Sequence, residues 1–330
     1  MDTSLARLVT LEGHRLGPVQ RSGPMSIVPV FGESAGERYL PPLTALKLSR
    51  VAGYGSVELE CRSTPSGEGI GIVPLHIGYI QDGAQNHALC RAALMAPGQK
   101  RMFDDACCVQ QTQGGYLEGR EQWFFVLPLH LRDEALRRRG EVAYGKLWPA
   151  IARLNEQFGK SSRGHLEDVI CRERPYLGQY VGRFERLPGQ LGALFFLSNT
   201  LVGIEIAPNE AFFAEMWMPL ACFCYGVAAM HRERKGVVDE SPPIEAKSLP
   251  ELRSAVLAGR RFAEEVIAGA LASIPEQRFS VTEEERLLDV ELVTAVSEHF
   301  SGQIVQECRG DKKKLVYASL AARRSWFADA

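Results

Sequence analysis

The sequence predicts an α+β protein: an antiparallel, β-rich N-terminal half followed by a helix-rich α+β half with two β-hairpins. Up to residue 135, short apolar runs are broken every eight to twelve residues by Gly or Pro, which is typical of antiparallel sheets. Beyond it, apolar residues recur at helical spacing, and two pairs of apolar runs are each joined by turn residues. We therefore expect a β-rich lobe over 1–135 and an α+β lobe over 136–330, either as two units or as one continuous domain.

The expected strands of the first half are short and apolar, and each is bounded by turn residues. They are Met25–Phe31, Thr44–Leu48, Ser56–Cys61, Ile70–Ile80, His87–Met95, Ala106–Gln110 and Gln122–Leu131.

Helix signals dominate the second half. Leu147, Ile151, Leu154 and Phe158 form a helical stripe, with Pro149 expected in its first turn. The segments 248–251 (Ser-Leu-Pro-Glu) and 282–285 (Thr-Glu-Glu-Glu) both fit the capping box that begins a helix. Behind the first box, a core-facing stripe is expected at Leu252, Val256, Phe262, Val266 and Leu271.

One segment, Met216–Met230, is almost wholly apolar, yet as a helix it would measure only about 22 Å, short of the ~30 Å of a bilayer core. We expect a buried helix that begins at Asn209. The two hairpins are Leu191–Leu197 with Leu201–Ile206, and Gln303–Cys308 with Leu315–Leu320.

Composition limits the function classes. With 45% hydrophobic and 24% charged residues, the 330-residue chain can bury a large core. Its 38 basic and 40 acidic residues give a net charge of −2, so nucleic acid is an unlikely partner and no membrane binding is expected. The first ten residues lack the apolar stretch of a secretion signal, and the eight cysteines show no disulfide framework; we therefore expect a cytoplasmic protein with reduced thiols.

The densest cluster of reactive side chains lies between residues 83 and 108. The amides of Gln85 and Asn86 can bind a ribose or a nucleobase, or alternatively close a local turn. His87 can act as a general base if Asp104 or Asp105 orients it, or it can be a hydrogen-bonded structural histidine. These three side chains, His87, Asp104 and Asp105, are the candidate catalytic residues.

Three further residues are candidate ligand contacts. Cys108 can line a pocket, although a buried apolar role is the alternative, and Gln110 follows it on the same strand. Glu205 either bonds ribose hydroxyls from the strand face opposite its apolar neighbours or faces water as a surface acid. The histidines are scattered and no phosphate loop is present, so neither a metal nor a cofactor is expected.

Several segments in order resemble one bacterial and archaeal family, the domain associated with ADP-ribosylglycohydrolases and rhodanese-phosphatase proteins. They are 83–87 (Gly-Ala-Gln-Asn-His), 107–111 (Cys-Cys-Val-Gln-Gln), 191–196 (Leu-Gly-Ala-Leu-Phe-Phe), 202–205 (Val-Gly-Ile-Glu) and 314–318 (Lys-Leu-Val-Tyr-Ala). The resemblance covers about residues 11–320 and implies a link to ADP-ribose or NAD-derived nucleotides. The chain departs from the family's pattern at Ala84, His87 and Gln110, where Lys, Arg and Glu are expected.

Two functions follow as alternatives. The first is binding of ADP-ribose or a related nucleotide at Gln85, Asn86 and His87, with hydrolysis as an open question. The second is a non-catalytic interaction protein that retains the fold with a degenerate site and binds a protein partner or another copy of itself. Trp326 and Phe327 are either an anchor for such a partner or a terminus packed on its own domain.

Overall fold

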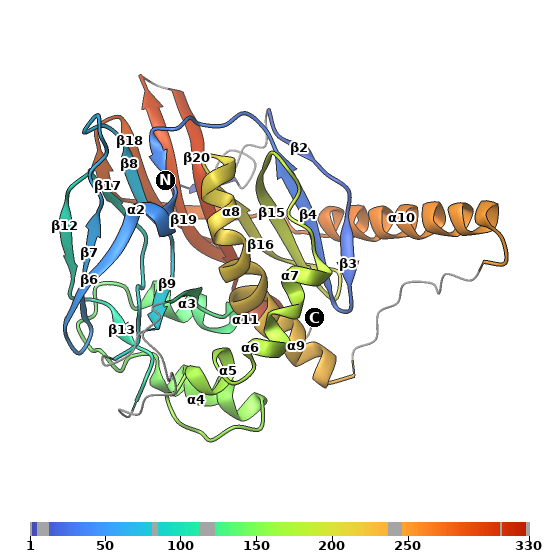
Figure 1. Ribbon diagram of the computed structural model, residues 1–330, viewed down its shortest axis with the longest axis horizontal. Helices are drawn as coiled ribbons and strands as arrows, with labels where there is room; N and C mark the ends of the chain where they lie inside the picture. Colours follow the sequence, from blue (N-terminus) through green and yellow to red (C-terminus); the bar gives the residue numbers. More distant parts are fainter. Residues whose placement is uncertain are drawn as a thin grey trace.

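A ten-stranded antiparallel sheet forms the centre of the protein, as seen in a computed structural model that describes residues 2–4, 13–80, 85–111, 123–236, 246–310 and 312–327 (Figure 1). The strands, from one edge to the other, are β1 (Asp2–Ser4), β17 (Arg278–Leu287), β18 (Val290–Val296), β19 (Phe300–Arg309), β20 (Lys312–Ala322), β16 (Thr200–Ile206), β15 (Gln190–Leu197), β4 (Met25–Phe31) and β2 (Arg15–Leu16), with β3 (Gln20–Ser22) paired to β4. Strands from both halves of the chain therefore share one sheet.

Three smaller sheets lie beside the large one. One contains β13 (Cys107–Cys108), β10 (His87–Ala88), β9 (Ile77–Ile80) and β14 (Trp123–Val126); the second contains β11 (Ala93–Met95), β8 (Ile70–Val73) and β5 (Tyr39–Leu40); the third contains β12 (Lys100–Phe103), β7 (Ser56–Cys61) and β6 (Leu46–Gly53). Strands take 37% and helices 31%, so the predicted α+β class is confirmed.

Both predicted hairpins are present. The β15–β16 turn consists of Ser198 and Asn199, whose φ angles are 45° and 66°. Positive φ at both central residues is the requirement of a type I′ turn, which matches the twist of the flanking strands. The β19–β20 turn contains Gly310 at φ 60°, and Asp311 lies outside the described residues.

A long apolar helix crosses the face of the large sheet, over β20, β16 and β15 (Figure 1). It comprises α8 (Glu210–Met218), the π-helical η1 (Pro219–Tyr225) and α9 (Gly226–Arg234). Its 25 residues and the mean hydropathy of 1.4 over its most apolar 18-residue window would suffice to span a membrane, but 78% of that window is buried. The predicted core helix is confirmed, and it begins where expected: the Asn209 side chain accepts a hydrogen bond from the Phe212 N–H at 2.8 Å.

Shorter helices complete the structure: α2 (Pro42–Ala45), α3 (Leu129–Arg137), α4 (Trp148–Gln157), α5 (Glu167–Ile170), α6 (Arg174–Leu177), α7 (Gln179–Arg183) and α11 (Arg324–Phe327). The predicted stripe from Leu147 to Phe158 is buried, and Pro149 lies in the first turn of α4, where its missing N–H costs nothing. Phe327 is buried and the Trp326 indole donates to the Leu201 carbonyl, so α11 packs on its own domain.

The helix α10 (Leu249–Ala272) begins at Ser248 as predicted, but its expected core face is wrong for the N-terminal half; of the C-terminal half, Leu271 packs on the core. The Ser248 hydroxyl accepts from the Glu251 N–H at 3.3 Å. Along the helix only Ile267 is fully buried, whereas Leu252 and Val256 are 41% and 48% exposed. Figure 1 shows the reason: α10 projects away from the body, so only its C-terminal part meets the sheet.

The second predicted capping box, at Thr282–Glu285, is wrong because these residues lie in β17. The strand pairs with β18 on one side and β1 on the other, and Thr282 faces Thr294. A local capping signal costs little to leave unused, so pairing of these residues with β18 decides the conformation. The second half therefore contains a further hairpin, β17–β18.

Other predicted strands are interrupted. The run 70–80 divides into β8 and β9 at His76, whose φ of 63° turns the chain from one small sheet into another. The run 87–95 divides into β10 and β11, Thr44 belongs to α2 rather than to a strand, and the run 122–131 ends as β14 before α3 begins. Each run is buried, so its apolar character was compatible with several backbone paths.

Candidate functional site

The small sheet β13-β10-β9 brings two of the predicted segments together. His87 pairs with Cys108 on one side and with Tyr79 on the other. The Val109 N–H donates to the Asn86 carbonyl at 3.0 Å, which continues the contact beyond the strand ends. Gln85, Asn86, His87, Cys108 and Gln110 thus lie in one place, whereas Gly83 and Ala84 lie outside the described residues.

His87 is held by backbone groups. It is 1% exposed, and its Nε2 accepts the Gly55 N–H at 3.1 Å, so its proton is on Nδ1, which donates to the Gln85 carbonyl at 2.9 Å. Burial lowers the pKa of His87, which favours the neutral ring. No carboxylate among the described residues hydrogen-bonds to His87, so neither Asp104 nor Asp105 orients it.

The side chain with the most unusual environment is Glu167, at the start of α5. Asn86 Nδ2 donates to Glu167 Oε1 at 2.7 Å. The other oxygen, Oε2, is buried and has no hydrogen-bond partner among the described residues; His165 Nδ1 lies 3.9 Å from it. Burial raises the pKa of Glu167 to about 7, against the opposing effect of the Asn86 hydrogen bond. Near neutral pH this carboxyl is therefore divided between its protonated and ionised forms.

The loop before α5 is fixed against the small sheet. Gln110 and His165 form an isolated β-bridge, and the Leu166 N–H donates to the Val109 carbonyl at 2.9 Å. Asn155 of α4 donates from Nδ2 to the carbonyls of Arg163 and His165, both at 2.8 Å. These bonds hold Glu167 next to Asn86 on a rigid support, as a precise site requires.

Cys108 completes the cluster as a thiol rather than a thiolate. Its Sγ lies 3.2 Å from Gln85 Oε1 and 3.0 Å from the Gln110 carbonyl oxygen, and the S–H can donate to only one of them at a time. Burial raises the pKa of Cys108 to about 11, so it is a poor nucleophile at neutral pH. We call the group the glutamate site; it consists of Gln85, Asn86, His87, Cys108, Gln110, His165 and Glu167.

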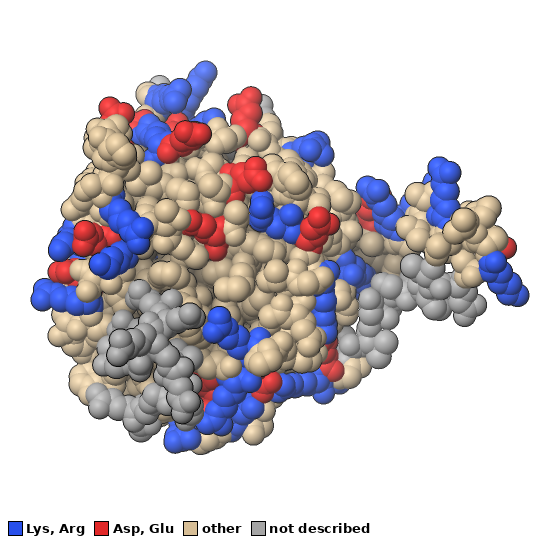
Figure 2. All heavy atoms as spheres, viewed as in Figure 1, with Lys and Arg blue, Asp and Glu red and all other residues tan. Residues whose placement is uncertain are grey.

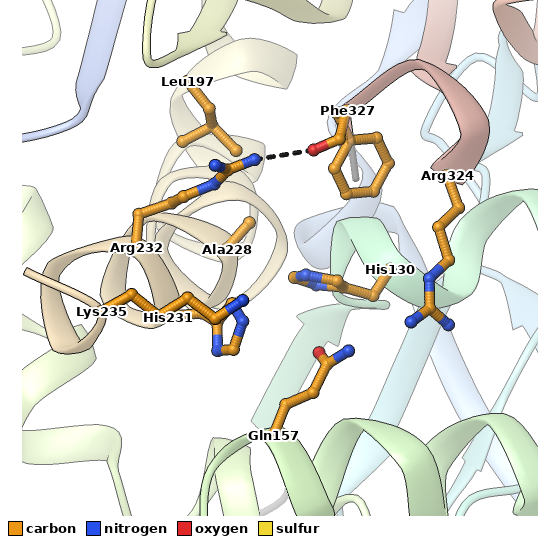
Figure 3. Close-up of a pocket in the computed structure, with 9 residues that line it drawn as sticks. All are labelled: His130, Gln157, Leu197, Ala228, His231, Arg232, Lys235, Arg324 and Phe327. Carbon is orange, nitrogen blue, oxygen red and sulfur yellow. Dashed lines mark hydrogen bonds between the residues drawn. The ribbon is translucent and has the colours of Figure 1, made fainter. Parts of the chain in front are cut away.

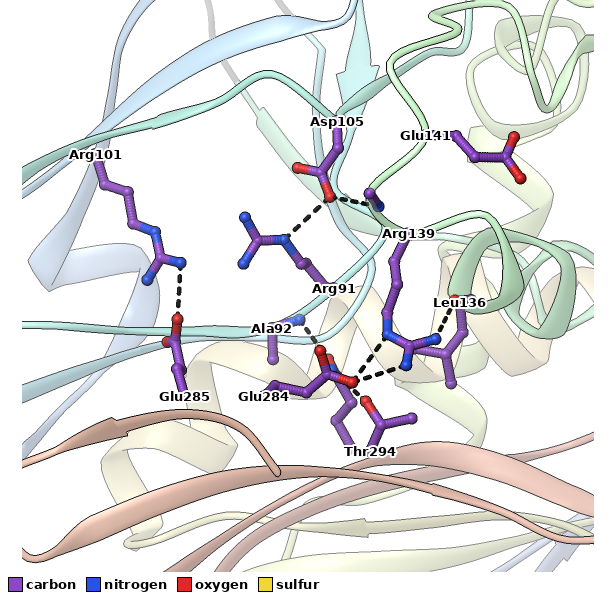
Figure 4. Close-up of polar contacts among 12 residues, drawn as sticks. Arg91, Ala92, Arg101, Asp105, Leu136, Arg139, Glu141, Glu284, Glu285 and Thr294 are labelled. Atoms are coloured by element: carbon purple, nitrogen blue, oxygen red, sulfur yellow. Dashed lines mark hydrogen bonds and ion pairs between the residues drawn. The ribbon is translucent and has the colours of Figure 1, made fainter. Parts of the chain in front are cut away.

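Asp104 and Asp105 have other partners, and Figure 4 shows those of Asp105. Asp105 Oδ2 accepts from Arg91 Nε at 3.0 Å and from the Gly140 N–H at 2.9 Å. Burial works to raise the pKa of Asp105, but these two partners outweigh it and lower the pKa. Asp104 accepts from the Ser56 hydroxyl at 2.5 Å. Both carboxylates thus bond to other groups and not to the glutamate site.

Glu205 lies in a third cluster, on the large sheet. It is 4% exposed, so the interpretation as a surface acid facing water is wrong. Its Oε1 accepts from Arg132 Nη1 and from the Tyr225 hydroxyl, both at 2.6 Å. Arg132 is fully buried and also donates to the Ser319 hydroxyl at 2.6 Å. This charged network joins α3, β16, η1 and β20 within the core.

The structure therefore gathers five of the eight predicted residues and adds two that the sequence analysis missed, His165 and Glu167. The only sequence signal for them is the acidic pair Glu167–Asp168 two residues after a histidine. That pattern has no metal or catalytic spacing, and among the described residues no group of three His, Cys, Asp or Glu could hold a metal ion.

In chemical terms the glutamate site offers a fixed amide, a thiol and one carboxyl that exchanges a proton near pH 7. Such a carboxyl can serve as a general acid or base for a bound hydroxyl group or water. Apart from His87 and His165, none of the residues named in the site is basic, so it suits hydroxyl and amide groups better than phosphates.

A family model described as the ARG and Rhodanese-Phosphatase-superfamily-associated Protein domain matches residues 13–319 of the chain. No curated protein and no solved structure matches it.

Proposed function

The chain belongs to the family of ARG and Rhodanese-Phosphatase-superfamily-associated protein domains, and from this premise we propose that it is a cytoplasmic protein that binds ADP-ribose or a related nucleotide at the glutamate site. The ligand class is the one that the family resemblance implies. Within the ligand, the ribose hydroxyls suit the site best, because Gln85 and Asn86 present amides and Glu167 presents an oxygen that accepts no hydrogen bond from described residues.

The observation that carries the proposal is the asymmetry of the Glu167 carboxyl. Asn86 fixes one oxygen, which leaves the other to accept a proton from a ribose hydroxyl or from a water. With its pKa raised to about 7 by burial, the carboxyl is matched to proton transfer at neutral pH. In a hydrolytic reaction Glu167 would be the general base, and it would supply the carboxyl that the family pattern leads one to expect at Gln110.

Ligand binding is tested by thermal shift with ADP-ribose, NAD and AMP, because a ligand that binds only the native state stabilises it by about 2.7 kcal/mol at one hundred times its Kd. We expect ADP-ribose to raise the Tm of the wild type, and the increase to shrink in Asn86→Ala. Glu156→Gln, an exposed change on α4, is the matched control and should respond like the wild type. An equal shift in Asn86→Ala and the wild type would place the ligand elsewhere.

Hydrolysis is tested separately by following the nucleotide by chromatography. Glu167→Gln keeps the acceptor oxygen for Asn86 but cannot take up a proton. We expect this variant to bind ADP-ribose. Its rate of product formation should be about 100-fold or more below that of the wild type, because that is the usual contribution of a general base. Equal rates in both proteins would exclude Glu167 as the base, and binding without turnover in the wild type would favour a non-catalytic protein.

One observation favours the second candidate function, self-association. The projecting part of α10 exposes Leu249 (82%), Leu252 (41%) and Val256 (48%) at the spacing of an apolar helix stripe. In Figure 2 the projection stands clear of the body and carries Lys or Arg side chains among uncharged ones. Arg253 and Glu264 lie about three helical turns apart, on the same side. In an antiparallel pair of α10 helices each Arg253 would face Glu264 of the other copy, so we propose that a second copy covers this stripe.

Light scattering after size exclusion tests this pairing. We expect a dimer for the wild type and a monomer for Leu252→Gln/Val256→Gln, because the change removes the apolar contact while Gln, a good helix former, preserves the helix at both positions. Arg21→Gln, on β3 of the sheet body, is the control. A wild-type monomer at micromolar concentration would argue against a dimer through α10.

A further inference from the structure

One hollow in the protein is lined mainly by basic side chains. It lies between α3, α9 and α11 and has a volume of about 60 Å³. The side chains that give it its character are His130, Gln157, His231, Arg232, Lys235 and Arg324 (Figure 3). We call it the basic pocket. It shares no residue with the glutamate site.

Three permanent cations converge on the basic pocket without a carboxylate. Arg232, Lys235 and Arg324 all line it, and no Asp or Glu among the described residues does. Arg232 donates from Nη2 to the Phe327 carbonyl at 2.7 Å, which holds its guanidinium at the pocket wall. Like charges brought together repel one another, and the resulting positive potential attracts an anion.

Burial and the positive charge of the pocket together lower the pKa values of two histidines, His130 and His231. Burial, followed by His231, Arg324, Arg232 and Lys235, lowers the pKa of His130 to about 3. Burial, followed by Lys235 and Arg232, also lowers the pKa of His231. Their ring centroids are 6.0 Å apart, and both rings are neutral at pH 7.

One buried nitrogen at the pocket, Nδ1 of His130, also lacks a hydrogen-bond partner among the described residues. Buried polar atoms are nearly always paired, so an unpaired one beside a hollow indicates a missing partner. Gln157 offers its amide from the opposite side, on α4 (Figure 3).

We propose that the basic pocket binds a small oxyanion, either inorganic phosphate or the terminal phosphate of an organic monophosphate, held by Arg232, Lys235 and Arg324. A single water needs about 10–15 Å³ of such volume, so the pocket accommodates a group of a few heavy atoms and not a whole nucleotide. Guanidinium forks match the tetrahedral oxygens of phosphate, and a Lys side chain at the mouth adds a mobile charge.

The test measures Tm and calorimetric binding in the full chain as phosphate is titrated against chloride at constant ionic strength. We expect a saturable response in the wild type and at least tenfold weaker binding in Arg324→Gln and Lys235→Gln, since a hydrogen bond to a charged group contributes about 1.5–3 kcal/mol. Arg62→Gln, an exposed change just after β7, is the matched control and should bind like the wild type. Glycerol phosphate distinguishes the two sources: binding of phosphate alone identifies a closed anion site, and binding of both identifies a phosphomonoester site.

Removal of a pocket cation gives an independent readout without ligand. Because the cations repel one another, Arg324→Gln should leave the Tm in phosphate-free buffer unchanged or higher, whereas a purely structural arginine would lower it. A phosphate response that rises without saturation and is equal in all variants is a general salt effect and would overturn the proposal. Glu167→Gln should keep the phosphate response, so failure of the glutamate site does not affect this result.

Discussion

Glu167→Gln changes the pH dependence of stability in a direction that follows from the burial of one carboxyl. The pKa of Glu167 is raised from 4.5 to about 7 in the folded protein. A group whose pKa rises on folding binds more protons in the native state, so its stabilising effect is complete below pH 4.5 and is lost as the pH rises through 7. At about 1.36 kcal/mol for each pH unit, ionisation of Glu167 lowers the free energy of unfolding by about 3 kcal/mol at pH 8.

The glutamine variant has no proton to lose, and it retains the oxygen that accepts from Asn86. We therefore expect the two proteins to have similar stability at pH 4, and the variant to be more stable by about 3 kcal/mol at pH 8. Urea unfolding at intervals from pH 4 to pH 8.5 measures the difference directly. Glu156→Gln, an exposed change on the neighbouring α4, is the control. Its difference in free energy of unfolding from the wild type should not change with pH. A flat difference for Glu167→Gln as well would refute the assignment of a raised pKa.

Three other predictions concern the core. Arg132→Met should lower the free energy of unfolding by about 3–5 kcal/mol, because it leaves Glu205 buried without its cation. In urea unfolding, Arg132→Met/Glu205→Leu should recover most of that loss. A double variant no more stable than the single one would argue against this account. Gly203→Ala should lower the free energy of unfolding by about 1–3 kcal/mol, since the new Cβ would lie 2.0 Å from the Tyr225 hydroxyl oxygen. Gly269→Ala on α10, where a new Cβ meets nothing within 4 Å, should be neutral or stabilising by the same measurement. Cys108, with its pKa raised to about 11 by burial, should resist iodoacetamide at pH 8 until urea unfolds the chain; rapid alkylation of the native protein at this residue, located by peptide mass analysis, would contradict its burial.

The candidate site was predicted in part because sheet pairing preserves local order. Gln85, Asn86 and His87 precede or form β10, and Cys108 lies in β13 with Gln110 two residues after it, so one antiparallel pairing brought them together. Glu205 and the acidic pair Asp104–Asp105 could not be placed in this way. Their partners, among them Arg132 and Arg91, are chosen by how distant elements pack, and a carboxylate in sequence gives no sign of the cation it will meet.

The sequence by itself determined the features that depend on neighbouring residues. The strand Met25–Phe31, the type I′ turn at Ser198–Asn199, and the helix starts at Asn209 and Ser248 all follow from local backbone preferences and hydrogen bonds that span a few residues. The α+β class and the burial of the long apolar helix follow from composition and periodicity in the same way.

Tertiary structure alone decided which of several locally acceptable states each remaining segment adopts. Residues 282–285 carry a helix cap yet lie in a strand, because they pair with β18 in a hairpin and Glu285 contacts the distant Leu94 N–H and Arg101. The stripe of α10 is exposed because the helix projects beyond the sheet. The raised pKa of Glu167 and the charge of the basic pocket arise likewise from groups that only folding brings within a few ångströms, where burial removes the water that would otherwise screen them.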